Sequence, residues 1–258
     1  MIKIMHRAAQ YLAAAGISFL EKEQDDSHTS FVWDSSLKAM IGQTLNREKG
    51  IRLALDYDDY ALCFLDNFKN VISVKGLNGS KHRDILFWIQ KEAENNGLHG
   101  PYNYQFHYEL PYSKMATSFS FPEPDMDQIS AMINHRTLAQ KSLETVIKKL
   151  GMQIPVRVWP HHFDTGTLIS TGTGDKEGFI KSIGIGLAIP DTMVNDYYFY
   201  VSGWSQSGSV KVERMSSLSK GEWRSGNWNG SVLEASGKDA QEVILFLAES
   251  IKMYHEII

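Results

Sequence analysis

The chain has 258 residues, of which 43% are hydrophobic and 22% are charged, and this composition excludes an intrinsically disordered protein. Its 26 basic and 30 acidic residues give a formal net charge of −4 and are spread along the sequence, so no basic surface for nucleic acid or an anionic membrane is expected. No apolar stretch is long enough to cross a bilayer or to act as a secretory signal, and we expect a cytoplasmic protein.

The first 96 residues have the pattern of a helix, several strands and a second helix. Apolar residues at helical spacing predict the first helix from residue 2 to about residue 23. A second helix is expected over 80–96, with Ser80 as its N-cap and Gly97 after its end. Alternating or apolar runs predict the strands between them, at 29–33, 50–56, 61–65 and 71–74.

The single cysteine, Cys63, excludes an internal disulfide bond and a thiolate zinc cage. It lies in the apolar run Ala61–Leu65, whereas a reactive thiol needs accessible, electropositive surroundings. We therefore interpret Cys63 as a buried, inert core residue.

Residues 97–124 form a different kind of segment, because glycine and proline interrupt them repeatedly. Within them, aromatic residues stand at every second position of one short stretch: Tyr102, Tyr104, Phe106 and Tyr108. This alternation predicts one strand inside a long connection between two halves of the chain.

The second half repeats the order of the first. A long helix is expected from Asp125 to about Leu150, ended by Gly151, and a last helix from Lys238 to about Glu256. The strands expected between them are 156–159, 182–189, 197–201 and 231–234. Consecutive strands between helices are typical of an α+β fold, mainly antiparallel sheet with helices packed on it.

The matching order of segments predicts two diverged helix–strands–helix repeats. We assign residues 1–96 to the first repeat, 97–124 to the connecting segment and 125–258 to the second repeat. Within the repeats, Ile51–Leu55 corresponds to Ile183–Leu187. The apolar residues of both stretches should face a core, because only one register buries them. The small residues Gly184, Gly186 and Ala188 indicate a close approach, by a packed helix or by a ligand.

The segment Trp159-Pro160-His161-His162-Phe163-Asp164 has the strongest concentration of chemically active side chains. In an extended chain His162 and Asp164 would share one side, and His161 and Phe163 the other. A carboxylate can orient an imidazole and raise its basicity, which serves both metal binding and general base catalysis. The alternative is that Pro160 ends a strand and the histidines satisfy buried backbone groups beside Trp159.

A divalent metal ion is therefore a candidate cofactor, held by His162, Asp164 and a further ligand. We assign Glu177 to this set, although Asp175, His107 and His135 are alternatives that the sequence does not separate. The chain has neither the HExxH spacing nor the cysteine ligands of common zinc sites. The neighbouring Thr171–Gly178 lacks the GK[ST] ending of a phosphate-binding loop, and its composition favours a hairpin loop.

Residues 156–234 resemble an uncharacterised bacterial protein family of unknown function. The resemblance lies in WPHHFD, a glycine-containing loop, the strand Ser182–Ile189 followed by Pro190-Asp191, the aromatic strand Tyr197–Val201 and the Trp223–Gly230 stretch. Where that family tends to have Glu-Pro, this chain has Asp196-Tyr197. The resemblance brings no activity, but it implies that His161, His162 and Asp164 belong to a recurring unit.

The aromatic residues of the second half indicate either strand packing or a platform for sugars and other planar ligands. They are Tyr198, Tyr200, Trp204, Trp223 and Trp228. The leading hypothesis is small-molecule binding by His161, His162, Asp164, Tyr198 and Tyr200. The alternatives are a metal-assisted hydrolase that uses His162 and Asp164, and an assembly protein without a site. We expect no nucleic-acid or membrane partner, and the sequence does not indicate an oligomeric state.

Overall fold

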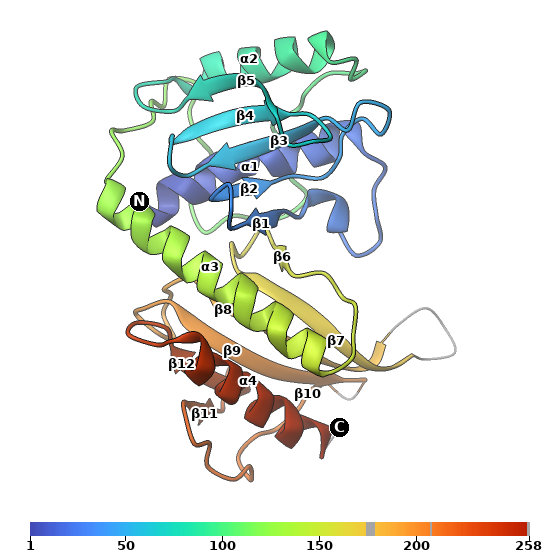
Figure 1. Cartoon of the computed structure of the whole chain (residues 1–258), viewed down its shortest axis with the longest axis vertical. Coiled ribbons are helices and arrows are strands. Elements are labelled where there is room, and N and C mark those ends of the chain that lie inside the picture. Colours follow the sequence, from blue (N-terminus) through green and yellow to red (C-terminus); the bar gives the residue numbers. More distant parts are fainter. Residues whose placement is uncertain (174–178, 207, 257–258) are drawn as a thin grey trace. The chain divides into compact units, whose positions relative to one another are not determined.

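The chain has an α+β fold in which helices pack on two antiparallel sheets, as the sequence predicted (Figure 1). The computed structural model describes residues 1–173, 179–206 and 208–256. The chain forms two compact units, of which unit 1 comprises Met1–Asn134 and Val158–Phe163, and unit 2 comprises His135–Arg157 and Asp164–Ile258. Within the described residues, no helix is both long and apolar enough to cross a membrane.

Unit 1 contains a five-stranded antiparallel sheet in which each strand pairs with the next in sequence, in the order β1-β2-β3-β4-β5. Its elements are α1 (Ile2–Phe19), the 3₁₀ turn η1 (Ser27–Thr29), β1 (Val32–Asp34), β2 (Ala39–Ile41), β3 (Arg52–Asp56), β4 (Ala61–Leu65), β5 (Val71–Gly76) and α2 (His82–Asn95). The short strand β2 was not predicted.

Helix α1 forms because alanine, the best helix former, fills much of its middle, and all of these alanines are buried. The helix contacts β3, whose Leu53 and Leu55 are buried as predicted. Gly16 is needed in this helix for space, since a Cβ there would lie 2.2 Å from the carbonyl oxygen of His28 in η1. The cost of a helical glycine is thus offset by close packing of the turn that follows the helix.

Helix α2 contacts β5, and its Trp88 ring meets the Phe64 ring of β4 edge to face at 5.5 Å. Cys63, the neighbour of Phe64 in β4, is buried, and this burial raises the pKa of its thiol to about 12. The interpretation of Cys63 as an inert core residue is confirmed by its burial, because the reactive thiolate is disfavoured there.

The strand predicted over Tyr102–Tyr108 is wrong, because this stretch has no strand partner and lies in a long irregular connection. The alternation itself is real, since Tyr102 is buried, Tyr104, Phe106 and Tyr108 are half-buried, and the residues between them are exposed. The stretch packs along α1: the Tyr102 hydroxyl donates to the carbonyl oxygen of Tyr11 at 3.0 Å, and the Tyr104 hydroxyl donates to that of Arg7 at 3.5 Å. A period of two therefore indicated an extended chain on a helix, not a strand in a sheet.

The same connection caps the N-terminus of α2. Ser80 was predicted as the N-cap, but the cap residue is Lys81 without a side-chain hydrogen bond, and the Ser80 hydroxyl donates to Gly76 instead. The first amides of the helix, those of His82 and Arg83, donate to the carbonyl oxygens of Phe119 and Thr117. Backbone carbonyls of the connection thus satisfy the N–H groups that a capping side chain usually satisfies.

Unit 2 contains a second antiparallel sheet, in which β7, β8, β9, β12 and β11 are neighbours in that order and β10 pairs with β9. The elements are α3 (Met126–Lys149), which begins in unit 1, β6 (Arg157–Val158), which spans the boundary between the units, β7 (Thr165–Thr173), β8 (Phe179–Ala188), β9 (Tyr198–Ser205), β10 (Gly208–Ser209), β11 (Glu222–Arg224), β12 (Gly230–Glu234) and α4 (Ala240–His255). Strand β7 was not predicted.

The core of unit 2 lies between this sheet and α4, which contacts β8, β9 and β12 (Figure 1). Ile183, Ile185 and Leu187 of β8 are buried, so the predicted register is confirmed. Helix α4 begins with a capping box, in which the Asp239 carboxylate accepts from the amides of Gln241 and Glu242 and the Glu242 side chain accepts from the amide of Asp239.

The two predicted repeats share the order helix, strands, helix. Strand β3 pairs with its predecessor β2 and its successor β4, and β8 pairs in the same way with β7 and β9. The duplication itself stays a prediction.

Candidate functional site

The WPHHFD segment forms a turn, so the extended geometry expected from Pro160 is wrong. The amide of Phe163 donates to the carbonyl oxygen of Trp159 at 2.7 Å, and Phe163 adopts φ +60°. A left-handed backbone costs about 1–3 kcal/mol at a bulky residue, and the complete burial of the Phe163 ring offsets that cost. Alternation of side chains between two faces does not hold in such a turn.

Within unit 1, two buried side chains of α1 form hydrogen bonds with this turn. The carbonyl oxygen of Pro160 accepts from His6 Nε2 at 2.6 Å and from Gln10 Nε2 at 2.8 Å. The His6 ring also stacks on Phe163, with 4.6 Å between centroids and 12° between planes. His6, which the sequence did not single out, therefore satisfies a buried backbone group of this turn.

The two histidines of the motif lie side by side in unit 1, with 4.4 Å between ring centroids. His161 is half-buried and its ring lies 5.9 Å from that of Tyr108, whereas His162 is exposed.

The other predicted site residues belong to unit 2, where the Tyr200 hydroxyl donates to Asp164 Oδ2 at 2.6 Å. Tyr198 makes a separate hydrogen bond, from its hydroxyl to Asp191 Oδ2 at 2.8 Å. Burial raises the pKa of both phenols, so each remains a hydrogen-bond donor at neutral pH.

At Gly186, the small-residue face of β8 accommodates an aromatic side chain of the neighbouring strand β9. A Cβ on Gly186 would lie 2.6 Å from the Tyr200 hydroxyl oxygen, and one on Gly166 of β7 would lie 2.9 Å from it. The Tyr200 ring therefore occupies the space that the two glycines leave.

Among residues 1–173, 179–206 and 208–256, no group of three or more His, Cys, Asp or Glu side chains is arranged to hold a metal ion. Glu177, the predicted third ligand, lies outside the described residues.

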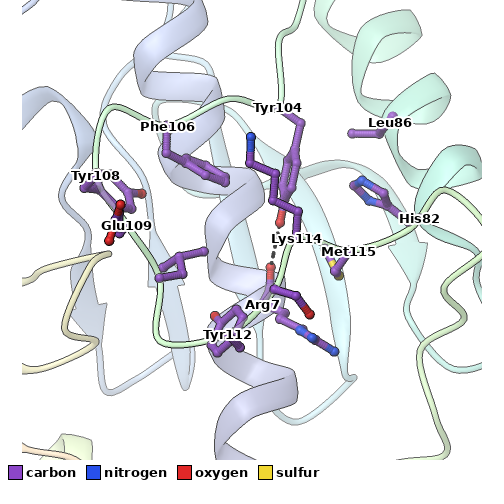
Figure 2. Close-up of a pocket in the computed structure, with 12 residues that line it drawn as sticks. Arg7, His82, Leu86, Tyr104, Phe106, Tyr108, Glu109, Tyr112, Lys114 and Met115 are labelled. Carbon is purple, nitrogen blue, oxygen red and sulfur yellow. Dashed lines mark hydrogen bonds between the residues drawn. The ribbon is translucent and has the colours of Figure 1, made fainter.

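A cavity of unit 1 lies elsewhere, beneath the connecting segment, and has a volume of about 450 Å³. Pockets that bind small organic molecules typically measure about 300–1,000 Å³. Six residues of the segment line it with apolar or aromatic surface: Tyr104, Phe106, Tyr108, Leu110, Tyr112 and Met115. Figure 2 shows the chain curving from Tyr104 round to Met115 over α1, with the Tyr104 and Phe106 rings directed into the space that it surrounds.

The helices supply another part of the wall, with Arg7 from α1 and His82 and Leu86 from α2, and the segment adds Glu109, Ser113 and Lys114. His82 is buried and shares a hydrogen bond of 2.7 Å with the Tyr11 hydroxyl through Nδ1. Burial lowers the pKa of His82, so its imidazole is neutral at pH 7. The Tyr104 ring packs edge-on against it at 4.7 Å. A hydrogen bond and a ring contact thus hold the His82 side chain in this wall.

The pocket and the WPHHFD turn are joined by one hydrogen-bonded chain. The Tyr108 hydroxyl donates to Gln10 Oε1 at 2.8 Å, and Gln10 Nε2 donates to the carbonyl oxygen of Pro160. Through Gln10, the turn thus helps to position Tyr108, which lines one side of the pocket. Of the predicted site residues, His161 contacts the lining of the pocket, with its ring 5.9 Å from that of Tyr108.

The sequence singled out Tyr104, Phe106 and Tyr108 of this pocket but assigned them to a strand, and it did not single out Tyr112. The tyrosine alternation within a proline- and glycine-rich connection was the available signal, because such a segment can wrap a helix instead of joining a sheet. Nothing in the sequence distinguished Arg7 or His82 from surface residues.

Comparisons of the chain with known protein families, with curated proteins and with solved structures found no match.

Proposed function

We propose that this protein binds a small organic molecule in the pocket of unit 1. The observation that carries the proposal is the cavity of about 450 Å³, walled by aromatic and aliphatic side chains with a few polar groups among them. Binding pockets combine a largely apolar wall, which supplies affinity, with a small number of polar groups, which orient the ligand. The class of function is that expected from the sequence, but the proposed site is formed by the connecting segment, α1 and α2.

The fixed positions of the lining side chains support the proposal. Tyr104, Tyr108 and His82 are each hydrogen-bonded to another residue of unit 1. A wall that is already ordered loses little conformational entropy when a ligand binds, and this raises affinity.

A matched pair of variants on α2 tests the proposal with N-phenylnaphthylamine, an uncharged dye that fluoresces in apolar pockets. Leu86→Trp places a large ring in the pocket, whereas Phe87→Trp changes the next residue, which is 73% exposed and does not line it. We expect saturable binding of one dye per chain, weakened about tenfold or more by Leu86→Trp and unchanged by Phe87→Trp. Equal binding by both variants, or no saturable binding by the natural chain, would refute the proposal.

The other two functions predicted from the sequence, metal-assisted hydrolysis with His162 and Asp164 and assembly without a site, stay predictions without a specific observation in their favour. A cytoplasmic location is part of the present proposal and rests on the sequence, whose single cysteine indicates no need for an oxidising compartment.

A further inference from the structure

Arg7 is a cation in the pocket wall without an anionic partner among the described residues. It is half-buried, and within the described part of the chain no carboxylate lies at ion-pair distance from it. Its Nε is buried and has no hydrogen-bond partner among those residues. A guanidinium usually pairs its planar N–H groups with a carboxylate or a phosphate, and a buried donor without a partner is costly.

Aromatic rings hold the Arg7 guanidinium in place without neutralising it. Its Cζ lies 5.0 Å from the ring centroid of Tyr112 and 5.0 Å from that of Phe119. Stacking of this kind is weakly favourable and restricts the side chain to a few rotamers. The guanidinium is therefore oriented in advance, with hydrogen-bonding capacity left over.

The surroundings of Arg7 favour a negative charge. Lys114 is a second cation in the pocket wall. The Tyr112 hydroxyl is buried without a partner in the described residues, and burial raises its pKa, so it stays a free donor. The acidic lining residue is Glu109, which Figure 2 shows beside Tyr108, on the other side of the pocket from Arg7.

We infer that the pocket takes an amphipathic organic anion, a small aromatic carboxylate or sulfonate, whose charged group binds Arg7 and the Tyr112 hydroxyl. This inference rests on the proposed function and specifies its ligand. The aromatic body lies against Phe106, Leu86 and Leu110, which supply the apolar wall. An anion completes the hydrogen bonds of Arg7, and charge-assisted bonds of this kind are about twice as strong as neutral ones.

Two dyes of nearly the same shape separate the anion from the apolar body. Anilinonaphthalene sulfonate carries a sulfonate, and N-phenylnaphthylamine is the same ring system without it. Titrating both against the full chain and against Arg7→Gln isolates the charged group. We expect Arg7→Gln to weaken sulfonate binding about tenfold and to leave binding of the neutral dye within about threefold. Arg7→Lys, which keeps the charge but loses the planar fork, should be intermediate.

Lys3→Gln is the matched control, because it removes a nearby surface charge that does not line the pocket. It should change sulfonate binding less than about threefold. Glu109→Gln provides a second test that does not disturb the packing of α1, since Glu109 is exposed. Removing its repulsion should strengthen sulfonate binding about two- to threefold and leave the neutral dye unaffected.

The outcomes distinguish this inference from the proposed function. If neither dye binds the natural chain, the pocket proposal fails and the anion inference fails with it. If the neutral dye binds and Arg7→Gln weakens both dyes equally, the pocket stands but Arg7 only packs there. If Arg7→Gln does not fold, Glu109→Gln decides, and an unchanged ratio of the two affinities overturns the inference.

Discussion

Aromatic side chains gather in both units, and they produce a cavity in one and a filled surface in the other. On the unit 2 sheet, the Tyr200 ring lies over Gly166 and Gly186, and the Trp228 ring lies 2.2 Å from where a Cβ on Gly230 would be. In unit 1, Tyr104, Phe106 and Tyr112 project from an irregular segment and line a cavity of about 450 Å³. A ring packs closely against a backbone only where the backbone has no side chain, so the pairing of rings with glycines accounts for the filled surface of the unit 2 sheet.

The largest expected effects test whether the cores beside the two sheets are equally well packed. Leu53 of β3 and Ile185 of β8 are both buried, and replacing either with Ala should cost about 2–5 kcal/mol. Loss of transfer free energy and the cavity left behind both contribute. Denaturant unfolding would measure these losses, with Leu245→Ala as the control, because Leu245 is 50% exposed on α4. A loss below about 1 kcal/mol at one core position would show that its sheet is loosely packed.

A smaller effect tests the filled surface itself. The Cβ of an alanine at 186 would lie 2.6 Å from both the Tyr200 hydroxyl and the carbonyl oxygen of Thr165, so Gly186→Ala should cost about 1–3 kcal/mol. The Cβ of an alanine at 184, in the same strand, would come no closer than 3.3 Å to another atom, the Ser202 hydroxyl oxygen, so Gly184→Ala should cost clearly less. Equal thermal shifts for the two variants would mean that Tyr200 is not held against β8.

The core elements of both units could be predicted because their signal is local. Alternation in Leu53–Leu55 and in Ile183–Leu187 fixes one buried face, and the alanines of α1 favour a helix whatever surrounds them. Strand β2 escaped prediction because it has three residues, too few to show a period. Strand β7 escaped because its threonines, glycines and serines resemble a loop, and pairing with β8 makes it a strand.

The candidate site could not be predicted, because its parts come together only through tertiary contacts. Arg7 and Tyr112 are about a hundred positions apart, and no pattern in either stretch refers to the other. Conversely, WPHHFD attracted attention through its chemistry, yet the contacts of Pro160 and Phe163 with His6 show that much of it anchors a turn. Residue type indicates what a side chain can do, and only the fold decides which groups remain without a partner.

The smallest expected effect separates the two regions at the level of one atom. The Tyr200 hydroxyl donates to a carboxylate oxygen of Asp164, so Tyr200→Phe should cost about 1–2 kcal/mol. The Tyr112 hydroxyl is buried with no partner in the described residues, so Tyr112→Phe should be neutral or stabilise the protein by up to about 1 kcal/mol. Both changes remove one oxygen from a tyrosine, and each serves as the control for the other in thermal unfolding. If Tyr112→Phe is as costly as Tyr200→Phe, the Tyr112 hydroxyl already has a partner, and it is not available to a ligand. If it is neutral for stability but weakens sulfonate binding, the hydroxyl is kept for the ligand rather than for the fold.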